Sequence, residues 1–292
     1  MTSILYDVPG PRARRRNRII GWLSALAIVG LVAYVLYRFD ATGQFEAIKW
    51  EQFKLPTVRH ELLRGLGATL RAAGAAAFLA LIYGAILAAG RLSDHRVFRW
   101  PTAFLVELFR AIPLLILIFF WYYAPLQYGH PLSTFLALVL GLTLYNGSVL
   151  AEIYRAGINA VASGQSEAAF AIGMRKTQVM TSILLPQAVR AMLPSIVSQL
   201  VVLLKDTALG FIITYPELLS VGKQLGGRLA FDLPYIPVYL VIAAIYISIC
   251  SALSLVANGL ERWTRRSHKT TARPAPPPEL AVEAPTLIEG GD

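Results

Sequence analysis

Long runs of apolar residues alternate with shorter polar segments along this chain of 292 residues. A helix that crosses a membrane needs about 20 predominantly apolar residues, because the hydrocarbon core of a bilayer is roughly 30 Å thick. Six runs reach or approach that length. The pattern therefore predicts an all-α membrane protein with six transmembrane helices, at residues 19–37, 65–90, 101–124, 132–151, 196–214 and 235–257.

One internal polar interruption, residues 162–194, separates the fourth run from the fifth and is amphipathic. Ser163 or Ser166 is suited to cap a first short helix, and Gly173 is suited to end it in a left-handed conformation. Thr177 is expected to start a second helix that Pro186 disturbs. The segment is thus predicted to be a helix-turn-helix.

The first short helix is expected to present Ala168, Ala169 and Ile172 on one face, by their spacing along a helix. Such a smooth apolar face suits the groove of a partner protein. A helix lying on the membrane interface has a similar composition, so composition alone leaves both interpretations open.

The rest of the chain divides by composition into four parts. Residues 1–18 form an Arg-rich tail, and residues 19–60 hold the first spanning helix and an external loop. A basic start before an apolar run is also typical of a signal peptide, but this run is long and lacks a small-residue cleavage site, which favours an uncleaved anchor. Residues 61–260 form the main transmembrane domain, and residues 261–292, rich in Pro and Ala, are predicted to be disordered.

Composition excludes several classes of protein. Hydrophobic residues make up 56% of the chain and charged residues 15%, and the mean hydropathy is +0.56, which is typical of a membrane protein. The net charge of +10 does not indicate nucleic acid, because the positive residues flank apolar runs. Cys250 is the single cysteine and the four histidines are far apart, so neither a disulfide framework nor a metal site is expected.

The distribution of basic residues predicts the orientation. Lys and Arg number 16 in the segments predicted on one side, which are 1–18, 91–100, 152–190 and 261–269. They number 7 in the segments predicted on the other side, which are 38–64, 125–131 and 215–234. Cytoplasmic segments carry the excess of Lys and Arg. Both termini and the interruption at 162–194 are therefore expected in the cytoplasm.

Charged and polar residues inside the apolar runs are candidates for a transport pathway, because such groups are costly in lipid. Lys205 and Asp206 fall near the middle of the fifth predicted span and, as sequence neighbours, lie about 100° apart around a helix. Arg110 either takes part or extends toward the interface. Asn146 either lines the pathway or forms a helix-to-helix hydrogen bond, and Glu152 is expected to pair with Arg155.

Several ordered motifs resemble one known family. Glu167-Ala168-Ala169, Gly173 and the later Ile183-x-Leu185-Pro186 resemble the EAA motif of ATP-binding-cassette (ABC) importer permeases. The segments at 150–158, 203–209 and 108–115, and Gly65-x-x-x-Thr69-Leu70, are similar to the polar amino-acid branch of that family. Ala111-Ile112 departs from the Gly-Thr usual in that branch. Residues 5–11 and the Arg cluster after them are similar to actinobacterial glutamate-importer permeases.

The resemblance implies the type I importer permease fold, an N-terminal helix plus a five-helix core, in a bacterial plasma membrane. It implies that the segment at 162–194 docks on an ATPase through Glu167, Ala168, Ala169, Gly173 and Pro186, and it adds Thr69 to the candidate pathway residues Arg110, Asn146, Lys205 and Asp206. Because no G-x-x-x-x-G-K-[ST] motif is present, ATP and Mg²⁺ are expected on a separate ATPase dimer. An extracytoplasmic solute-binding protein and a second permease chain, identical or homologous, complete the expected assembly.

The expected function is uptake of a polar amino acid, with glutamate as the best candidate, by a subunit that is not itself an enzyme. Lys205 and Asp206 also suit an alternative, a secondary transporter driven by an ion gradient. The two differ in whether uptake needs ATP.

Overall fold

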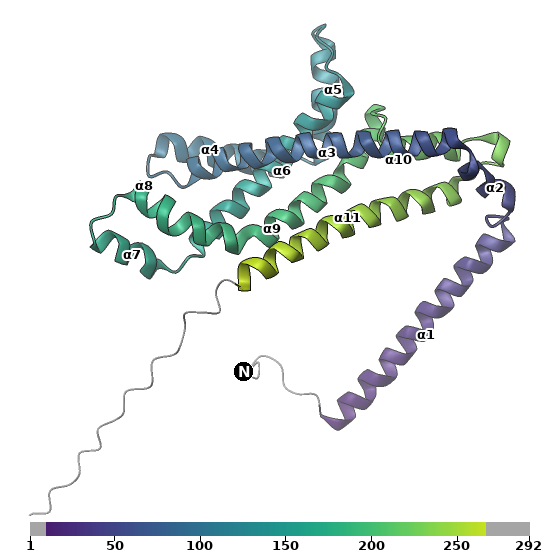
Figure 1. Ribbon diagram of the computed structural model, residues 1–292, viewed down its shortest axis with the longest axis horizontal. Helices are drawn as coiled ribbons and strands as arrows, with labels where there is room; N and C mark the ends of the chain where they lie inside the picture. The colour runs from purple at the N-terminus through teal and green to yellow at the C-terminus, as the bar shows by residue number, and fades with distance from the viewer. Residues whose placement is uncertain (1–9, 267–292) are drawn as a thin grey trace, which may run out of the picture.

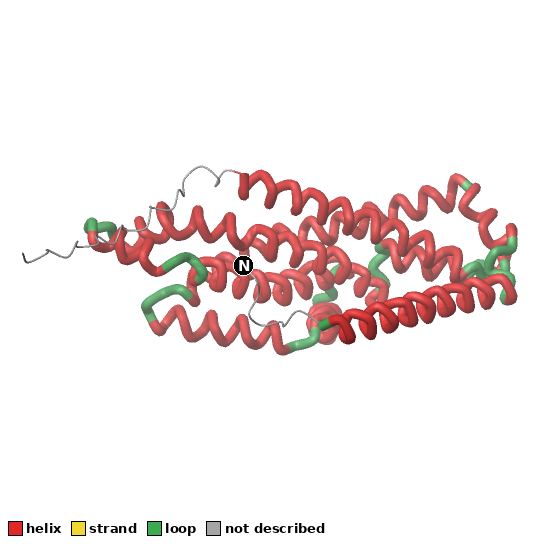
Figure 2. Tube along the Cα trace, turned by 90° about the horizontal axis from the view of Figure 1, so that it is seen from below, coloured by secondary structure: helices red, strands yellow, loops and turns green. Residues whose placement is uncertain are grey.

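The computed structural model describes residues 10–266, and within them it contains helices and connecting turns without a β-strand (Figure 2). The α-helices are, in order, α1 (Pro11–Ala41), α2 (Ala47–Glu51), α3 (Pro56–Arg91), α4 (Arg96–Ala111), α5 (Leu114–Gln127), α6 (Thr134–Asn159), α7 (Ser163–Ala171), α8 (Lys176–Gln178), α9 (Leu185–Asp206), α10 (Leu218–Gly226) and α11 (Tyr235–Arg266). Short 3₁₀ or π segments, labelled η1 (Gln52–Lys54), η2 (Val179–Leu184), η3 (Thr207–Ile213) and η4 (Leu229–Phe231), join some of them. The predicted all-α class is confirmed.

Five helical segments are long and apolar enough to cross a membrane, and a bent pair makes a sixth. The pair is α4 and α5, which meet at an angle of 98°. The prediction of one continuous span at 101–124 was therefore wrong. Pro113 has no N–H to donate and disfavours helical geometry at the residue before it, and Ile112 accordingly has an extended ψ of 126°.

The core is a bundle in which α3, α6, α9 and α11 pack together (Figure 1). Small residues let α3 and α6 approach closely: a Cβ at Gly84 would lie 2.7 Å from the carbonyl oxygen of Gly147. In lipid, helix association depends on such close packing, because burial of apolar surface gives little drive. The predicted span at 65–90 is confirmed, and α3 extends it to residue 56.

Helix α1 stands apart from this bundle (Figures 1 and 2). None of its 31 residues is buried within the chain. An apolar helix without protein contacts is suited to lipid on every side. The helix begins at Pro11, so part of the segment predicted as a tail at 1–18 is helical, and residues 1–9 lie outside the described residues.

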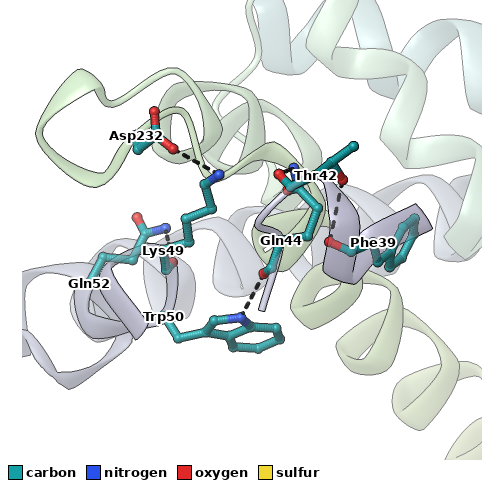
Figure 3. Close-up of polar contacts among 7 residues, drawn as sticks. All are labelled: Phe39, Thr42, Gln44, Lys49, Trp50, Gln52 and Asp232. Atoms are coloured by element: carbon teal, nitrogen blue, oxygen red, sulfur yellow. Dashed lines mark hydrogen bonds and ion pairs between the residues drawn. The ribbon is translucent and has the colours of Figure 1, made fainter. Parts of the chain in front are cut away.

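A compact elbow joins α1 to α3 and ties the chain to the turn after α10 (Figure 3). The buried Nζ of Lys49 pairs with a carboxylate oxygen of Asp232 at 2.8 Å. Trp50 donates its ring N–H to the carbonyl of Gln44 at 3.1 Å, and Gln52 donates to the carbonyl of Lys49 at 3.3 Å. These contacts fix this end of the bundle although α1 itself is not packed.

The second half of the chain shows three further differences from the sequence prediction. The helix that contains the predicted fifth span starts much earlier, so that residues 176–213 form one nearly continuous rod. The loop predicted between the last two spans contains α10. Helix α11 continues to Arg266, so the boundary predicted at 260 falls inside a helix, and residues 267–292 lie outside the described residues.

Candidate coupling surface and transport pathway

The helices α7 and α8 lie at one end of the long axis of the molecule, and the elbow with α2 lies at the other (Figure 1). The predicted helix-turn-helix is present, but its cap is not the predicted one. Ala162 is the N-cap residue and has no side chain to accept a bond, while Ser163 is already helical. The Ser166 hydroxyl donates to the carbonyl of Ser163 at 2.8 Å, so it does not act as a cap either.

The C-terminal end of α7 matches the prediction. Gly173 has a φ of +84°, in the left-handed region that strains residues with a Cβ. The backbone N–H groups of Gly173 and Met174 return to the carbonyls of Phe170 and Ala169. Gly173 therefore reverses the chain between the two short helices.

The face that α7 presents differs in one residue from the prediction. Glu167 and Ala168 are exposed, but Ala169 is only 5% exposed because α7 packs against η2 on that side. Phe170 and Ile172 are 50% and 79% exposed. The apolar surface available to a partner is therefore formed by Ala168, Phe170 and Ile172, without Ala169.

A π-helical segment, η2, lies between the turn and the membrane-spanning helix α9. Pro186 follows it within the first turn of α9, where a missing N–H costs least. The predicted disturbance near Pro186 is thus a change of helix type rather than a break. After the turn that follows α7, a nearly continuous helix runs from Lys176 to Asp206, at the far end of α9.

Asn146, near the middle of α6, is fully buried and joins two helices. It donates to the carbonyl of Leu142 at 3.1 Å, and its Oδ1 accepts a 2.7 Å hydrogen bond from Gln199 of α9. The Asp206 side chain also interacts with Asn146. The structure therefore brings two predicted residues together and adds Gln199, which the sequence did not single out because a glutamine within an apolar run has many possible partners.

Lys205 and its neighbour Asp206 lie at the C-terminal end of α9, beside η3, rather than in the middle of the span. They point in different directions, as their spacing predicts: Asp206 turns toward α6, while Lys205 lines a cavity of about 410 Å³. Tyr239, Tyr246 and Cys250 of α11 line the same cavity, and Lys205 is the one charged residue among its described lining residues.

Thr69 is buried, and its hydroxyl accepts a 3.1 Å hydrogen bond from the N–H of Leu218 at the start of α10. Beside it lies Glu217, which has no exposed surface and caps α10 by accepting from the N–H groups of Leu219 and Ser220. Tyr246 of α11 donates its hydroxyl to the same carboxylate at 3.0 Å. The contact of Thr69 thus links α3 to the start of α10, and a part for Thr69 in the pathway stays a prediction.

Glu217 was missed by sequence reasoning, although one signal was present. An acidic residue directly before an apolar stretch is favoured near the start of a helix, and Glu217 follows Pro216 in this way. The sequence predicts a plain loop here because a nine-residue helix leaves little periodic pattern.

A charged cluster lies at the end of α6 that is nearer to α7. Glu152 forms the predicted pair with Arg155 and also contacts Arg91 of α3 at 3.1 Å. Arg110, in the last turn of α4, is exposed and acts on Glu152 at longer range. The structure thus places Arg110 with this cluster and apart from Asn146, Lys205 and Asp206. Among the described residues, no group of His, Cys, Asp and Glu side chains is arranged to hold a metal ion.

Comparison with known proteins shows the family to which the chain belongs. Residues 80–266 match the family described as binding-protein-dependent transport system inner membrane component. The chain belongs to this family. This permease is 44% identical over 230 residues to the glutamate transport system permease protein GluD of Corynebacterium glutamicum, a match that covers 77% of this chain and 83% of the relative.

Two further matches support the assignment. The permease is 36% identical over 197 residues to a probable glutamine ABC transporter permease protein, GlnP, of Bacillus subtilis, with 68% of this chain and 90% of the relative covered. Its fold matches a crystal structure of an amino acid ABC transporter with histidines at a TM-score of 0.67 and 27% identity, covering 72% of this chain and 97% of that one. The permease is a multi-pass inner membrane subunit of an ABC importer, and the alternative of a secondary transporter is set aside.

Proposed function

We propose that this permease forms the pathway for a polar amino acid, with glutamate as the best candidate, and that a separate ATPase dimer drives it through α7. The observation that carries the proposal is the continuous helix from α8 to Asp206. A displacement of α7 reaches the polar residues of the bundle through a rod, because a packed helix transmits displacement with little loss.

The ATPase surface is proposed to be the exposed face of α7 with Glu167, Ala168, Phe170 and Ile172, followed by the reversal at Gly173. An exposed Ile beside an exposed Phe is the kind of apolar anchor that protein interfaces use. ATP and Mg²⁺ belong to the partner in this proposal. A solute-binding protein delivers the amino acid to the opposite end, near the elbow at α2, and a second permease chain completes the pathway.

The preference for glutamate rests on Lys205 and on the name of one relative. An ammonium group on the wall of a cavity that is otherwise lined by apolar and tyrosine side chains favours an anionic ligand group, since a charge in such surroundings is weakly screened. The GluD relative of Corynebacterium glutamicum is described as a glutamate permease. Arg110 has no part in this pathway proposal, because it lies with Glu152.

The proposed orientation has both termini and α7 in the cytoplasm. Two reporters test it, each fused in turn to the turn at 172–175 and to the turn at 42–46. Green fluorescent protein fluoresces in the cytoplasm, and alkaline phosphatase is active outside it. Fluorescence at the first site and phosphatase activity at the second are expected, and the reverse result contradicts the orientation.

Uptake by the permease reconstituted with its ATPase and binding protein tests the function. Lys205→Gln is expected to raise the KM for glutamate about tenfold while glutamine uptake changes little, since roughly 1.4 kcal/mol of ion pairing corresponds to that factor. Lys223→Gln, which removes another exposed cation, is the matched control. Equal effects of both substitutions, or uptake without ATP, contradict the proposal.

A further inference from the structure

A cleft of about 780 Å³ has residues of α8 in its lining, and α8 lies with α7 at one end of the molecule. Its walls come from three spanning segments: the last turns of α3, the end of α6 and the first turns of α9. The walls are mostly apolar and include Ala85, Ala89, Ile158, Val189 and Met192. The small alanine side chains on α3 leave the space open. The body of the cleft is therefore suited to a hydrocarbon chain and poorly suited to a soluble amino acid.

Apart from Tyr154 of α6, the polar residues that line the cleft come from two neighbouring segments at one end. Ser93, Asp94 and His95 come from the turn between α3 and α4, and Lys176 and Thr177 come from α8. The carboxylate of Asp94 pairs with the ammonium group of Lys176 across this end. The cleft is thus polar at its end and apolar along its length, which is the pattern of an amphiphilic ligand.

The charges at the polar end are mainly positive. Arg99 and His95 act on Asp94 together with Lys176, and Arg175 directly precedes Lys176 in the chain. The hydrogen bond and charge of Lys176, followed by the weaker influence of His95 and Arg99, hold the pKa of Asp94 below its ordinary value. One exposed carboxylate is therefore set against the two cations Lys176 and Arg99, and the surplus of positive charge favours an anionic head group.

We propose that this cleft binds an anionic phospholipid, with an acyl chain between α3 and α9 and the phosphate at Lys176 and Thr177. Juxtamembrane Lys and Arg attract anionic lipids, and a neutral lipid fits the apolar walls equally but lacks the electrostatic contribution. The site is distinct from the transport pathway, and its occupant contacts the residue at which the second coupling helix begins.

Photolabelling of the complete permease and ATPase complex in lipid nanodiscs tests the site. Phosphatidylglycerol or phosphatidylcholine with a diazirine in one acyl chain is supplied at equal mole fraction, and mass spectrometry locates the labelled peptides. Phosphatidylglycerol is expected to label peptides containing Ala89 and Val189 roughly five times more than phosphatidylcholine, the factor expected for one basic residue near a lipid head group.

Two variants and one control separate the possible results. Lys176→Glu is expected to reduce phosphatidylglycerol labelling to the level of phosphatidylcholine, and Ala89→Phe, which fills the cleft, is expected to reduce labelling by both lipids. Lys223→Glu, a charge reversal far from the cleft, should change neither. Two results overturn the proposal. If both lipids label equally and Lys176→Glu changes nothing, the peptides only touch the ordinary bilayer. If these peptides cross-link to the ATPase instead of to lipid, the cleft is a protein interface.

Discussion

The side-chain amide of Gln199 donates a 2.7 Å hydrogen bond to Oδ1 of Asn146, and the two residues are 53 positions apart in the chain. This bond joins α9, which follows α7 and α8 in the chain, to α6 in the centre of the bundle. The side chain of Asp206, the last residue of α9, also interacts with Asn146. Asn146 is thus the buried side chain through which α6 contacts two polar residues of α9.

Gln199→Leu is expected to lower the thermal stability of the purified complex, because it leaves the Asn146 oxygen without its partner. Interhelical hydrogen bonds in membranes are worth about 0.6 kcal/mol on average and up to about 1.7 kcal/mol. Thermal unfolding in detergent measures the loss of stability, and uptake in proteoliposomes measures the accompanying change in transport. Gln187→Leu is the control, since Gln187 also lies on α9 but bonds only to the carbonyl of Ile183 in its own helical stretch; an equal loss in both variants would show that the link to α6 has no special value.

Gly173→Ala is expected to weaken coupling without disturbing the core. No atom lies within 4 Å of the added Cβ, so the cost is the left-handed backbone alone, about 1 to 2 kcal/mol. ATPase activity stimulated by the loaded binding protein should fall, while the stability of the bundle stays unchanged.

Gly164→Ala provides a matched comparison in the same docking segment. Gly164 also has free space around its Cβ position, but it lies inside α7, where Ala is the better helix former. Its coupling should equal that of the wild type. If Gly173→Ala couples equally well, the reversal at the end of α7 has no role in docking.

Gly84→Ala is expected to destabilise the contact between α3 and α6. The new methyl group would lie 2.7 Å from the Gly147 carbonyl oxygen, and overpacking of this kind costs about 1 to 3 kcal/mol. Thermal unfolding of the solubilised protein measures the loss. Gly74→Ala, on the same helix with nothing within 4 Å, should be neutral or slightly stabilising, and similar losses in both variants would refute the packing explanation.

The ion pair between Asp94 and Lys176 should be insensitive to pH in the physiological range. The folded-state pKa of Asp94 is lowered, so its contribution to stability is present above the unfolded pKa near 4 and is lost only as the pH falls through the lower folded value. His95 also acts on Asp94, so both proteins should carry His95→Asn, which removes the neighbouring group that can change charge in this range. In that background the difference in melting temperature between Asp94 and Asp94→Asn is expected to be constant from pH 5 to pH 8. A difference that changes within this range contradicts the assignment.

Apolar run length and charge were sufficient to predict most of the spanning helices, the two-helix coupling segment and the left-handed Gly173. These features depend on local sequence, as does the pair of Glu152 with Arg155 three residues later. Run length failed at Pro113, because the bend there changes direction without adding any polar residue. It also failed for the start of the fifth span, since the polar residues at 176–190 do not interrupt the helix.

The candidate site was predictable only in part, for a different physical reason. Lys205, Asp206 and Asn146 attract attention as polar residues in apolar runs, but the choice of partners depends on which helices meet. Gln199 became significant only once α6 and α9 were placed together, and Ala169 turned inward only because η2 covers it. Burial of Glu217 likewise depends on α3 and α11, which are distant in the chain.

The buried cap at Glu217 has a consequence for how the chain is assembled in the membrane. Helix α10 starts where little water is available, so its first N–H groups depend on Glu217 and on the Thr69 hydroxyl. The carboxylate accepts from the N–H groups of Leu219 and Ser220, and Tyr246 of the last spanning helix adds a third donor. Helix α11 therefore completes a cap that α10 and α3 have begun, so the last part of the chain to be synthesised adds to the folding of the segment before it.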